Sequence, residues 1–314
     1  MSDEIESWFK FRGDGIKRSF TPPTPPPWRQ FAKNSDNPRF KRGKNFIPPT
    51  GALKLINAAI YLRRPLLVTG KPGTGKTSLA YALAEELGLD ILRWNIGTRS
   101  TLKDALYRYD AIARVQDGKQ LSDIGNYMRL GPLGSALWSK ANKPKVLLVD
   151  EIDKSDIDLP NDLLHVLEEG RFEIPELKRL KESEESKAVK VETELKEIAE
   201  IVDGEVICKE FPYVVMTSNG ERDFPPAFLR RCLRLKMEEP EVDKLRRIVA
   251  GYLGDKVQKD YDNIIEEFCE QRKSKVLATD QLLNAVHLIS KGKIDNIQAI
   301  EALKQALLQP LDES

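Results

Sequence analysis

Short apolar runs recur through the middle of the chain, each bounded by polar or turn residues. They occupy positions 66–69, 91–95, 146–149 and 213–217. Runs of this length, without alternation of apolar and polar residues, are typical of strands buried on both faces of a parallel sheet. Between them, residues 77–88 and 158–170 place apolar side chains at helical spacing and end on a glycine suited to a helix terminus. The alternation predicts an α/β core with a parallel sheet.

The pattern changes after position 240, where the strand signal vanishes. Four segments with apolar residues three to four positions apart follow, at 241–254, 261–273, 279–292 and 296–308. Asp280 and Asn296 stand near the expected starts of the last two helices. We therefore expect an α/β core over residues 51–239 and a small four-helix domain over residues 240–314.

Residues 1–50 differ from both parts. The run TPPTPPP at 21–27 predicts extended, polyproline-like chain. Ten Lys and Arg residues oppose five Asp and Glu residues here, and the basic residues are densest at 39–44. Two interpretations stay open for this proline-rich basic arm. It is a solvated linker, or it docks on a neighbouring subunit or an acidic partner through Trp8, Phe9 and Trp28.

A charged segment at about 177–203 interrupts the α/β rhythm. It is rich in Lys and Glu, and its second half carries a weak helical stripe of apolar residues, namely Leu195, Ile198, Ile201 and Val202. The strand-like pieces at 171–177 and 204–210 flank it and are expected to form a hairpin. We interpret the segment as an insertion at the hairpin tip, most simply a solvated helical face.

Composition narrows the class of protein. The 50 Lys and Arg residues almost balance 49 Asp and Glu residues, and a net charge of +1 argues against whole-molecule attraction to nucleic acid or anionic membrane. No apolar run approaches the roughly 20 residues that span a bilayer, and the acidic start is unlike a signal peptide. Three cysteines lack a paired spacing, and two histidines exclude a multi-histidine metal centre. We expect a cytoplasmic protein without a membrane partner.

The sequence GKPGTGKT at 70–77 matches the phosphate-binding pattern G-x-x-x-x-G-K-[ST] between a predicted strand and a predicted helix. Glycines allow a tight turn whose N–H groups, with the helix N-terminus, point at phosphate oxygens. Lys76 would reach the β- and γ-phosphates, and the Thr77 hydroxyl would ligate Mg²⁺. The expected nucleotide-binding residues are Gly70, Pro72, Gly73, Thr74, Gly75, Lys76, Thr77, Ser78 and Asp150. The loop does not read the base, so ATP and GTP both stay open.

Two acids end the next apolar strand, in the sequence VLLVDE at 146–151. The strand end would place Asp150 beside the phosphate loop, where it can hold Mg²⁺ together with Thr77. Glu151 would then act as the base that polarises an attacking water, which favours hydrolysis over phosphate transfer. Asp153 is interpreted as a surface or supporting residue.

Two further candidates follow the strand at 213–217. Asn219 stands just past its end and could reach the γ-phosphate and the attacking water. Arg230 and Arg231 are adjacent in AFLRRCLRL. An arginine placed at a neighbouring subunit's γ-phosphate stabilises the transition state, by roughly 10³–10⁵ in rate where measured. The plainer alternative is an arginine paired with an acidic surface.

The order GKPGTGKT, VLLVDEID, VVMTSN, PPAFLRRC and a helical C-terminal part resembles the AAA+ ATPases, specifically a divergent member of their MoxR-like branch. The resemblance covers about residues 52–311. It implies a five-stranded parallel core, a helical lid over the adenine, and a ring, usually hexameric, with ATP sites between subunits. It further implies Mg²⁺-dependent ATP hydrolysis that remodels or switches a client protein in a chaperone-like manner. Clients of the branch often carry a von Willebrand A-type domain.

The same resemblance assigns the arginine finger and shows where this sequence departs from the family pattern. The family pattern L-P-x-A-x-L-D-R-F places Arg231 on the finger position, with Arg230 replacing the usual Asp. The acidic motif reads DEIDKS where the branch commonly has DEINRA. The expected second-sensor arginine is missing from ATDQLL at 278–283. No threading loop of aromatic-apolar-Gly type is evident, which disfavours a processive unfoldase.

Two alternative functions stay open. The missing second-sensor arginine motivates an ATP-binding assembly switch, or scaffold, that hydrolyses little. The basic cluster at 39–44 motivates a nucleic-acid loader or motor, which ranks third because the overall charge is neutral and no nucleic-acid module is recognised.

Overall fold

A computed structural model of the chain describes residues 9–11, 15–30, 43, 46–49, 51–118, 121–139, 143–181, 188–292, 294 and 296–311. The chain divides into two compact units. The α/β unit comprises Pro48–Lys71 and Gly75–Glu238, and the helical unit comprises Met1–Ile47, Pro72–Thr74 and Glu239–Ser314. The described residues up to Ile47 thus group with the helical unit, and Pro48 and Pro49 group with the α/β unit.

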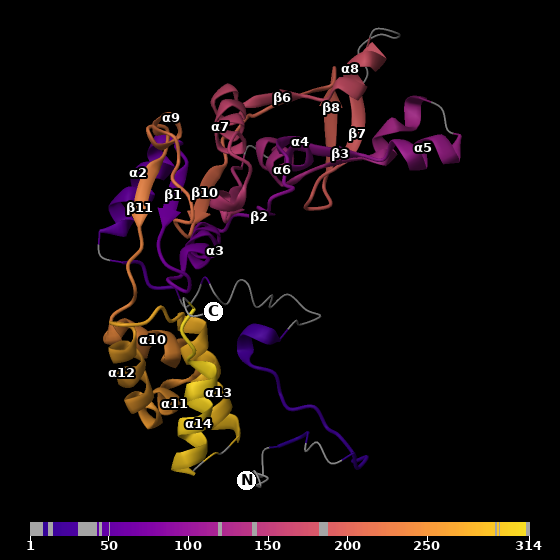
Figure 1. Cartoon of the computed structure of the whole chain (residues 1–314). Helices are drawn as coiled ribbons and strands as arrows, with labels where there is room; N and C mark the ends of the chain where they lie inside the picture. The colour runs from indigo at the N-terminus through magenta and orange to yellow at the C-terminus, as the bar shows by residue number, and fades with distance from the viewer. Residues whose placement is uncertain are drawn as a thin grey trace. The chain divides into compact units, whose positions relative to one another are not determined.

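The α/β unit contains a five-stranded parallel sheet (Figure 1). Its order is β11 (Leu233–Lys236), β1 (Leu66–Thr69), β10 (Tyr213–Ser218), β5 (Val146–Asp150) and β2 (Ile91–Asn95). All of β5 is buried, which explains its unbroken apolar run. The predicted five-stranded parallel core is confirmed. Strand β11 was not among the predicted runs because it is an edge strand in which only Leu235 is fully buried.

Helices connect these strands, and two of them end at the glycines that the sequence predicted as helix termini. Helix α2 (Ala52–Leu62) precedes β1, and α9 (Pro226–Leu229) precedes β11. Helix α3 (Lys76–Leu87) follows the phosphate loop, and α7 (Leu159–Glu169) follows the short turn η3 (Ile152–Lys154) after β5. Both α3 and α7 end on glycines in the left-handed conformation, Gly88 with φ 61° and Gly170 with φ 63°, which a residue without a Cβ adopts at little cost.

A second sheet of six strands lies on the β2 side of the parallel sheet, away from α2 (Figure 1). Its order is β3 (Tyr107–Tyr109), β4 (Met128–Leu130), β7 (Ala188–Glu192), β8 (Ile198–Val202), β9 (Glu205–Ile207) and β6 (Arg171–Glu173). The accompanying helices are α4 (Leu102–Leu106), α5 (Ala111–Asp117), η2 (Leu121–Tyr127), α6 (Pro132–Leu137) and α8 (Pro175–Lys181). Strands β6 and β9 pair antiparallel, so the expected hairpin is present.

The helical interpretation of the charged insertion is wrong for its second half. Residues Ile198–Val202 form strand β8, which pairs antiparallel with β7. Ala199 and Ile201 are buried, while Ile198 and Val202 are each about half exposed. Apolar residues at 198, 201 and 202 have helical spacing, but the pairing with β7 makes the segment a strand and buries positions 199 and 201. Residues 182–187 lie outside the described chain.

The helical unit packs α10 (Val242–Leu253), α11 (Asp255–Asp260), α12 (Asp262–Gln271), α13 (Thr279–Gly292) and α14 (Ile297–Leu307) around one apolar core. The four predicted helices are present, and α11 is an additional short one. The Asn296 side chain accepts hydrogen bonds from the N–H groups of Gln298 and Ala299, so it caps α14. No helix in the described ranges is long and apolar enough to cross a membrane.

Trp28 of the proline-rich segment packs on this unit, within its own chain. Its Nε1 donates to Asn284 Oδ1 over 3.2 Å, and its ring meets those of Tyr252 and His287 edge-on. Amphipathic contacts of this kind satisfy both the ring and the N–H of tryptophan. Trp28 thus has partners within its own chain, and docking of the arm on a neighbouring subunit stays a prediction. Trp8 and most of the basic cluster at 39–44 lie outside the described residues.

Candidate active site

The phosphate loop joins β1 to α3. Its backbone has positive φ at Gly70 (155°), Gly73 (75°) and Gly75 (93°). The value at Gly75, directly before α3, lies in the region that side chains disfavour, so glycine permits the sharp entry into the helix. The first N–H groups of α3, which have no partner within the helix, are available to an anion at this turn.

Lys76 is the buried cation of the loop, with 7% of its surface exposed. Its Nζ donates to the carbonyl oxygens of Gly70 over 2.6 Å and Lys71 over 2.8 Å. Burial lowers the pKa of Lys76, while the nearby charges of Asp153, Asp150 and Glu151 act in the opposite direction. The ammonium group is thus held inside the loop, as binding to phosphate oxygens would require.

Asp150 ends β5 and is 5% exposed. Its Oδ1 accepts hydrogen bonds from the hydroxyls of Thr77, at 3.0 Å, and Thr217, at 2.7 Å. Its Oδ2 forms an ion pair with Arg93 Nη2 at 2.6 Å. The structure therefore brings together Thr77 and Asp150, the residues predicted to hold a metal.

Sequence reasoning missed Arg93 and Thr217 at this carboxylate. Arg93 lies on β2, which pairs with β5 so that Asn95 stands opposite Asp150. Only the strand order shows that Arg93 is near the acid, because the two residues lie far apart in the sequence. Thr217 is the last residue of the predicted run at 213–217, and a polar side chain there is a signal that was available.

Glu151 has a left-handed backbone, with φ 63°. For a residue with a Cβ this conformation costs about 1–2 kcal/mol. Its N–H donates to Thr217 Oγ1 over 2.9 Å, which holds the turn where β5 ends. Its side chain is 43% exposed and pairs with Lys154 at 3.0 Å, and this hydrogen bond raises the pKa of Lys154. A carboxylate at the sheet edge that water reaches suits the predicted base.

Asn219 follows β10 at the same edge, and a buried acid fixes its backbone. The N–H groups of Asn219 and Glu221 donate to Asp153 Oδ2 over 2.8 and 3.2 Å. Asp153 is 5% exposed, so it is not a surface residue but a support for the Asn219 turn. Arg222 adds a second tie, since its Nη1 donates to the carbonyl oxygen of Ser155 over 2.9 Å.

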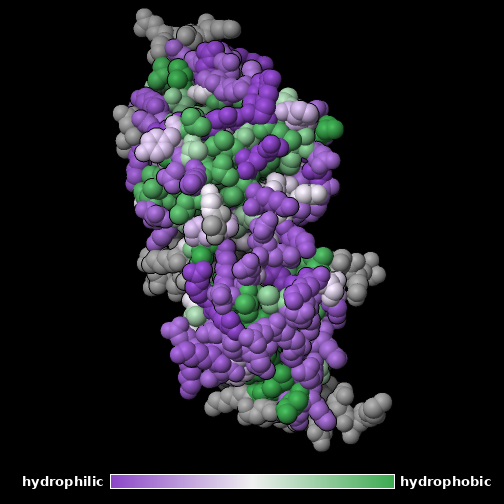
Figure 2. Space-filling model, turned by 90° about the vertical axis from the view of Figure 1, so that its left-hand side faces the viewer, coloured by the Kyte–Doolittle hydropathy of each residue, from purple (hydrophilic) through white to green (hydrophobic). Residues whose placement is uncertain are grey.

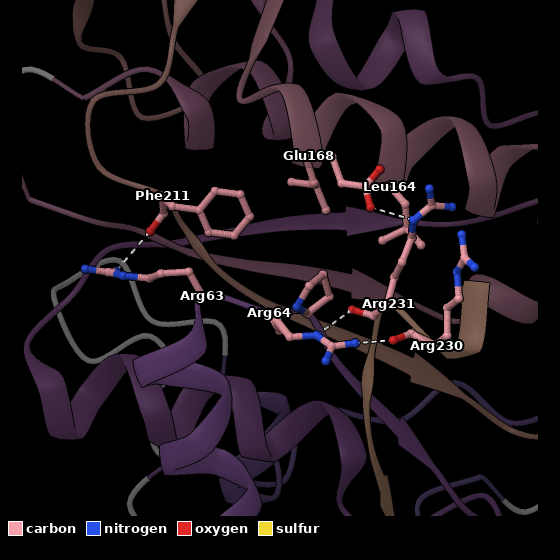
Figure 3. A pocket seen from close by; sticks show the side chains of 9 residues that line it. Arg63, Arg64, Leu164, Glu168, Phe211, Arg230 and Arg231 are labelled. Atoms are coloured by element: carbon pink, nitrogen blue, oxygen red, sulfur yellow. Dashed lines mark hydrogen bonds and ion pairs between the residues drawn. The ribbon is translucent and has the colours of Figure 1, made fainter. Parts of the chain in front are cut away.

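Arg230 and Arg231 line a different cavity, of about 650 Å³ (Figure 3). Its other charged lining residues are Arg63, Arg64 and Glu168. Pro65 and Phe211 also line it. They lie one residue before β1 and two residues before β10, so the cavity lies at the amino ends of the strands. We call it the arginine pocket. Arg231 Nε pairs with Glu168 there. The structure thus gathers the strand-end residues at one edge of the sheet and the two arginines at the other.

A family model for the AAA domain (dynein-related subfamily) matches residues 65–232, more than half of the chain. The chain belongs to this AAA family. The family confirms the predicted AAA+ fold with its phosphate loop and, at the level of the family, the predicted enzyme class of P-loop ATP hydrolases.

Curated relatives match shorter stretches of the chain. The chain is 34% identical over 93 residues to the replication factor C large subunit of Nanoarchaeum equitans, covering 30% of this chain and 16% of that protein. It is 35% identical over 107 residues to the Lon protease of Leptospira interrogans, covering 33% of this chain and 11% of that protein. The matches thus span less than a fifth of either relative.

Solved structures also match the chain, at low identity. A point mutant of Thermotoga maritima RuvB is 15% identical with a TM-score of 0.46, over 85% of this chain and 72% of that chain. The Thermotoga maritima RuvB Holliday junction branch migration motor is 15% identical with a TM-score of 0.41, over 81% and 67%.

Proposed function

We propose that this AAA protein hydrolyses ATP at sites that are completed by a second copy of the chain. The position of Arg231 carries the proposal. Lys76, Asp150 and Asn219 stand at the carboxyl edge of the parallel sheet, and Arg231 stands at its amino edge. At about 3.3 Å per residue, strands of this length separate the edges by roughly 15 Å. An arginine side chain does not span that gap, so Arg231 would act on a neighbour's nucleotide.

A head-to-tail contact of this kind repeats from copy to copy and forms a ring when the rotation between copies closes. The arginine pocket supports such an interface because it holds four arginines and one acid, Glu168, among its charged lining residues. Figure 2 shows hydrophobic side chains gathered on the side of the α/β unit where α2 lies in Figure 1. On α2, Leu53 and Leu62 are 58% and 59% exposed. Apolar surface beside a charged pocket suits a protein interface. We propose a hexamer, as in the MoxR-like branch.

Each residue has a role in the reaction that follows from its place. The loop N–H groups and the Lys76 ammonium bind the β- and γ-phosphates. Glu151 accepts the proton of the attacking water, and Asn219 orients that water against the γ-phosphate. Arg231 of a neighbour, with Arg230 beside it, stabilises the charge that develops on the phosphate oxygens.

Thr77 and Asp150 fit a magnesium ion. Their oxygens lie 3.0 Å apart, and Mg²⁺ in nucleotide sites takes one or two protein oxygens besides water and phosphate. When bound, Mg²⁺ would neutralise charge on the β- and γ-phosphates. Arg93 holds the Asp150 carboxylate in one orientation through its ion pair.

We further propose that the ATPase remodels or switches a client protein, as members of the MoxR-like branch do, with a von Willebrand A-type protein as the candidate client. The six-stranded second sheet and α5 support this idea. They lie apart from the nucleotide residues and expose apolar side chains, among them Ile112, Val115, Ile198 and Val202.

ATP turnover per subunit across protein concentration tests the proposal, with wild type, Glu151→Gln and Arg231→Ala. Specific activity should rise with concentration and collapse in both variants. Arg234→Ala, which removes an exposed arginine of β11, is the matched control and should stay active. Flat, near-zero turnover with ATP binding retained would support the assembly switch instead. Salt-sensitive stimulation by DNA or RNA would support the nucleic-acid motor.

A further inference from the structure

Arg63 and Arg64, the two adjacent arginines that follow α2, bind different groups of the protein. Arg63 has a left-handed backbone, with φ 52°, and the N–H of Arg64 donates to the Ala59 carbonyl oxygen over 3.2 Å. This turn ends α2 and directs both guanidinium groups into the arginine pocket (Figure 3).

Arg64 reaches the backbone of the finger segment. Its Nε donates to the carbonyl oxygen of Arg231 over 3.2 Å, and its Nη2 donates to that of Arg230. These carbonyls follow α9, a helix of four residues whose last carbonyl groups have no partner within the helix. A guanidinium presents several N–H groups in a fixed plane, so one arginine can hold two successive carbonyls.

The same stretch of backbone has a second contact, from the residue after Arg64 to the second residue after Arg231. The N–H of Leu233 donates to the carbonyl oxygen of Pro65 over 2.9 Å, where β11 begins beside β1. Residues 64–65 thus fasten residues 230–233 at the amino edge of the sheet. The Arg231 side chain leaves from a backbone that is held in place by Arg64.

We propose that Arg64 is a positioning residue for Arg231. It fixes the backbone from which the finger extends toward a neighbouring nucleotide, while its own N–H groups are occupied by the two carbonyls. The inference rests on the proposed function of Arg231. Arg63 makes other contacts: its Nη1 donates to Phe211 O over 3.2 Å, and its guanidinium lies 4.9 Å from the centre of the Tyr213 ring. The matched control is Arg234, an exposed arginine of β11 outside the arginine pocket.

The test compares Arg64→Ala, Arg64→Lys, Arg234→Ala, Arg231→Ala and the double variant Arg64→Ala/Arg231→Ala in the full chain. We expect Arg64→Ala to lower kcat about tenfold to a hundredfold, the range in which small displacements of a catalytic group act. The KM for ATP should stay near wild type, because the phosphate loop is untouched. Arg64→Lys should recover part of kcat, since an ammonium can hold a carbonyl but not in the same fork. Arg234→Ala should keep kcat.

The double variant separates positioning from an independent role. If Arg64 acts through Arg231, the double variant has the kcat of Arg231→Ala alone. A further loss in the double variant, or an unchanged kcat in Arg64→Ala and Arg64→Lys, would overturn the inference. Thermal unfolding identifies a variant that fails to fold, and Arg64→Lys, which keeps the cation, then decides. Full turnover in Arg231→Ala would refute the proposed function itself, whereas an inactive Arg231→Ala with active Arg64 variants would refute only this step.

Discussion

Replacing Asp153 should destabilise the α/β unit and slow ATP turnover together. The Asp153 carboxylate is 5% exposed and accepts two backbone N–H groups, from Asn219 at 2.8 Å and Glu221 at 3.2 Å. Hydrogen bonds to a charged group contribute about 1.5–3 kcal/mol each. Part of this loss of stability is offset, because the substitution also removes a buried charge. The Oδ1 of Asp153 lacks a hydrogen-bond partner in the described structure, so its burial is unfavourable.

We expect a net loss of about 2–3 kcal/mol for Asp153→Ala. In a unit of this size each kcal/mol corresponds to about 2–4 °C, so the Tm should fall by roughly 5–10 °C. Below that temperature kcat should also fall, since the turn that carries Asn219 loses its tether. Asp153→Asn keeps one oxygen acceptor and should lose about half as much stability.

Thermal unfolding by circular dichroism and steady-state ATP turnover measure the two effects. Asp158→Ala is the matched control, because it removes an exposed acid five residues further along the chain and should change neither. An Asp153→Ala protein with the wild-type Tm and the wild-type kcat would show that the tether to Asn219 has no energetic weight.

Three further predictions follow from single contacts. Arg93→Met leaves the buried Asp150 carboxylate without its ion pair. Urea unfolding should therefore show a free energy of unfolding that is about 1–3 kcal/mol lower, and Arg93→Lys should lie between Arg93→Met and wild type. Wild-type stability in Arg93→Met would contradict this. Burial raises the pKa of Cys232 to about 12. Because alkylation needs the thiolate, mass spectrometry should find Cys232 unlabelled by iodoacetamide in the native protein at pH 8. Labelling as fast as in the unfolded chain would refute the burial. Trp28→Ala removes the ring contacts with Tyr252 and His287 and the hydrogen bond to Asn284. The free energy of unfolding of the helical unit, measured in urea, should therefore fall by about 1–2 kcal/mol. An unchanged urea midpoint would show that the segment is not docked.

The sequence predicted those parts of the site that local pattern specifies. The phosphate loop and the acids after β5 are contiguous in the chain, and each follows a recognisable strand. The pairs Arg93–Asp150 and Asp153–Asn219 depend on strand order and on the turns between strands, which the local pattern does not encode. They form only when the sheet is assembled.

Two further differences have the same physical origin. The sequence of β8 indicates a weak helix because Ile198, Ile201 and Val202 have helical spacing, and its pairing with β7 makes it a strand. Arg64 carries no sequence signal for its role, since it contacts residues more than 160 positions away. Tertiary partners decide both cases.

Mixing two inactive variants tests the shared active site most directly. Glu151→Gln keeps its finger but loses its base, and Arg231→Ala keeps its base but loses its finger. In an equal mixture that assembles at random, about a quarter of the interfaces pair an intact Glu151 with a neighbour's intact Arg231. ATP turnover in the mixture should therefore recover to roughly a quarter of wild type. If the mixture stays as inactive as either variant alone although mixed assemblies form, Arg231 does not complete a neighbour's site.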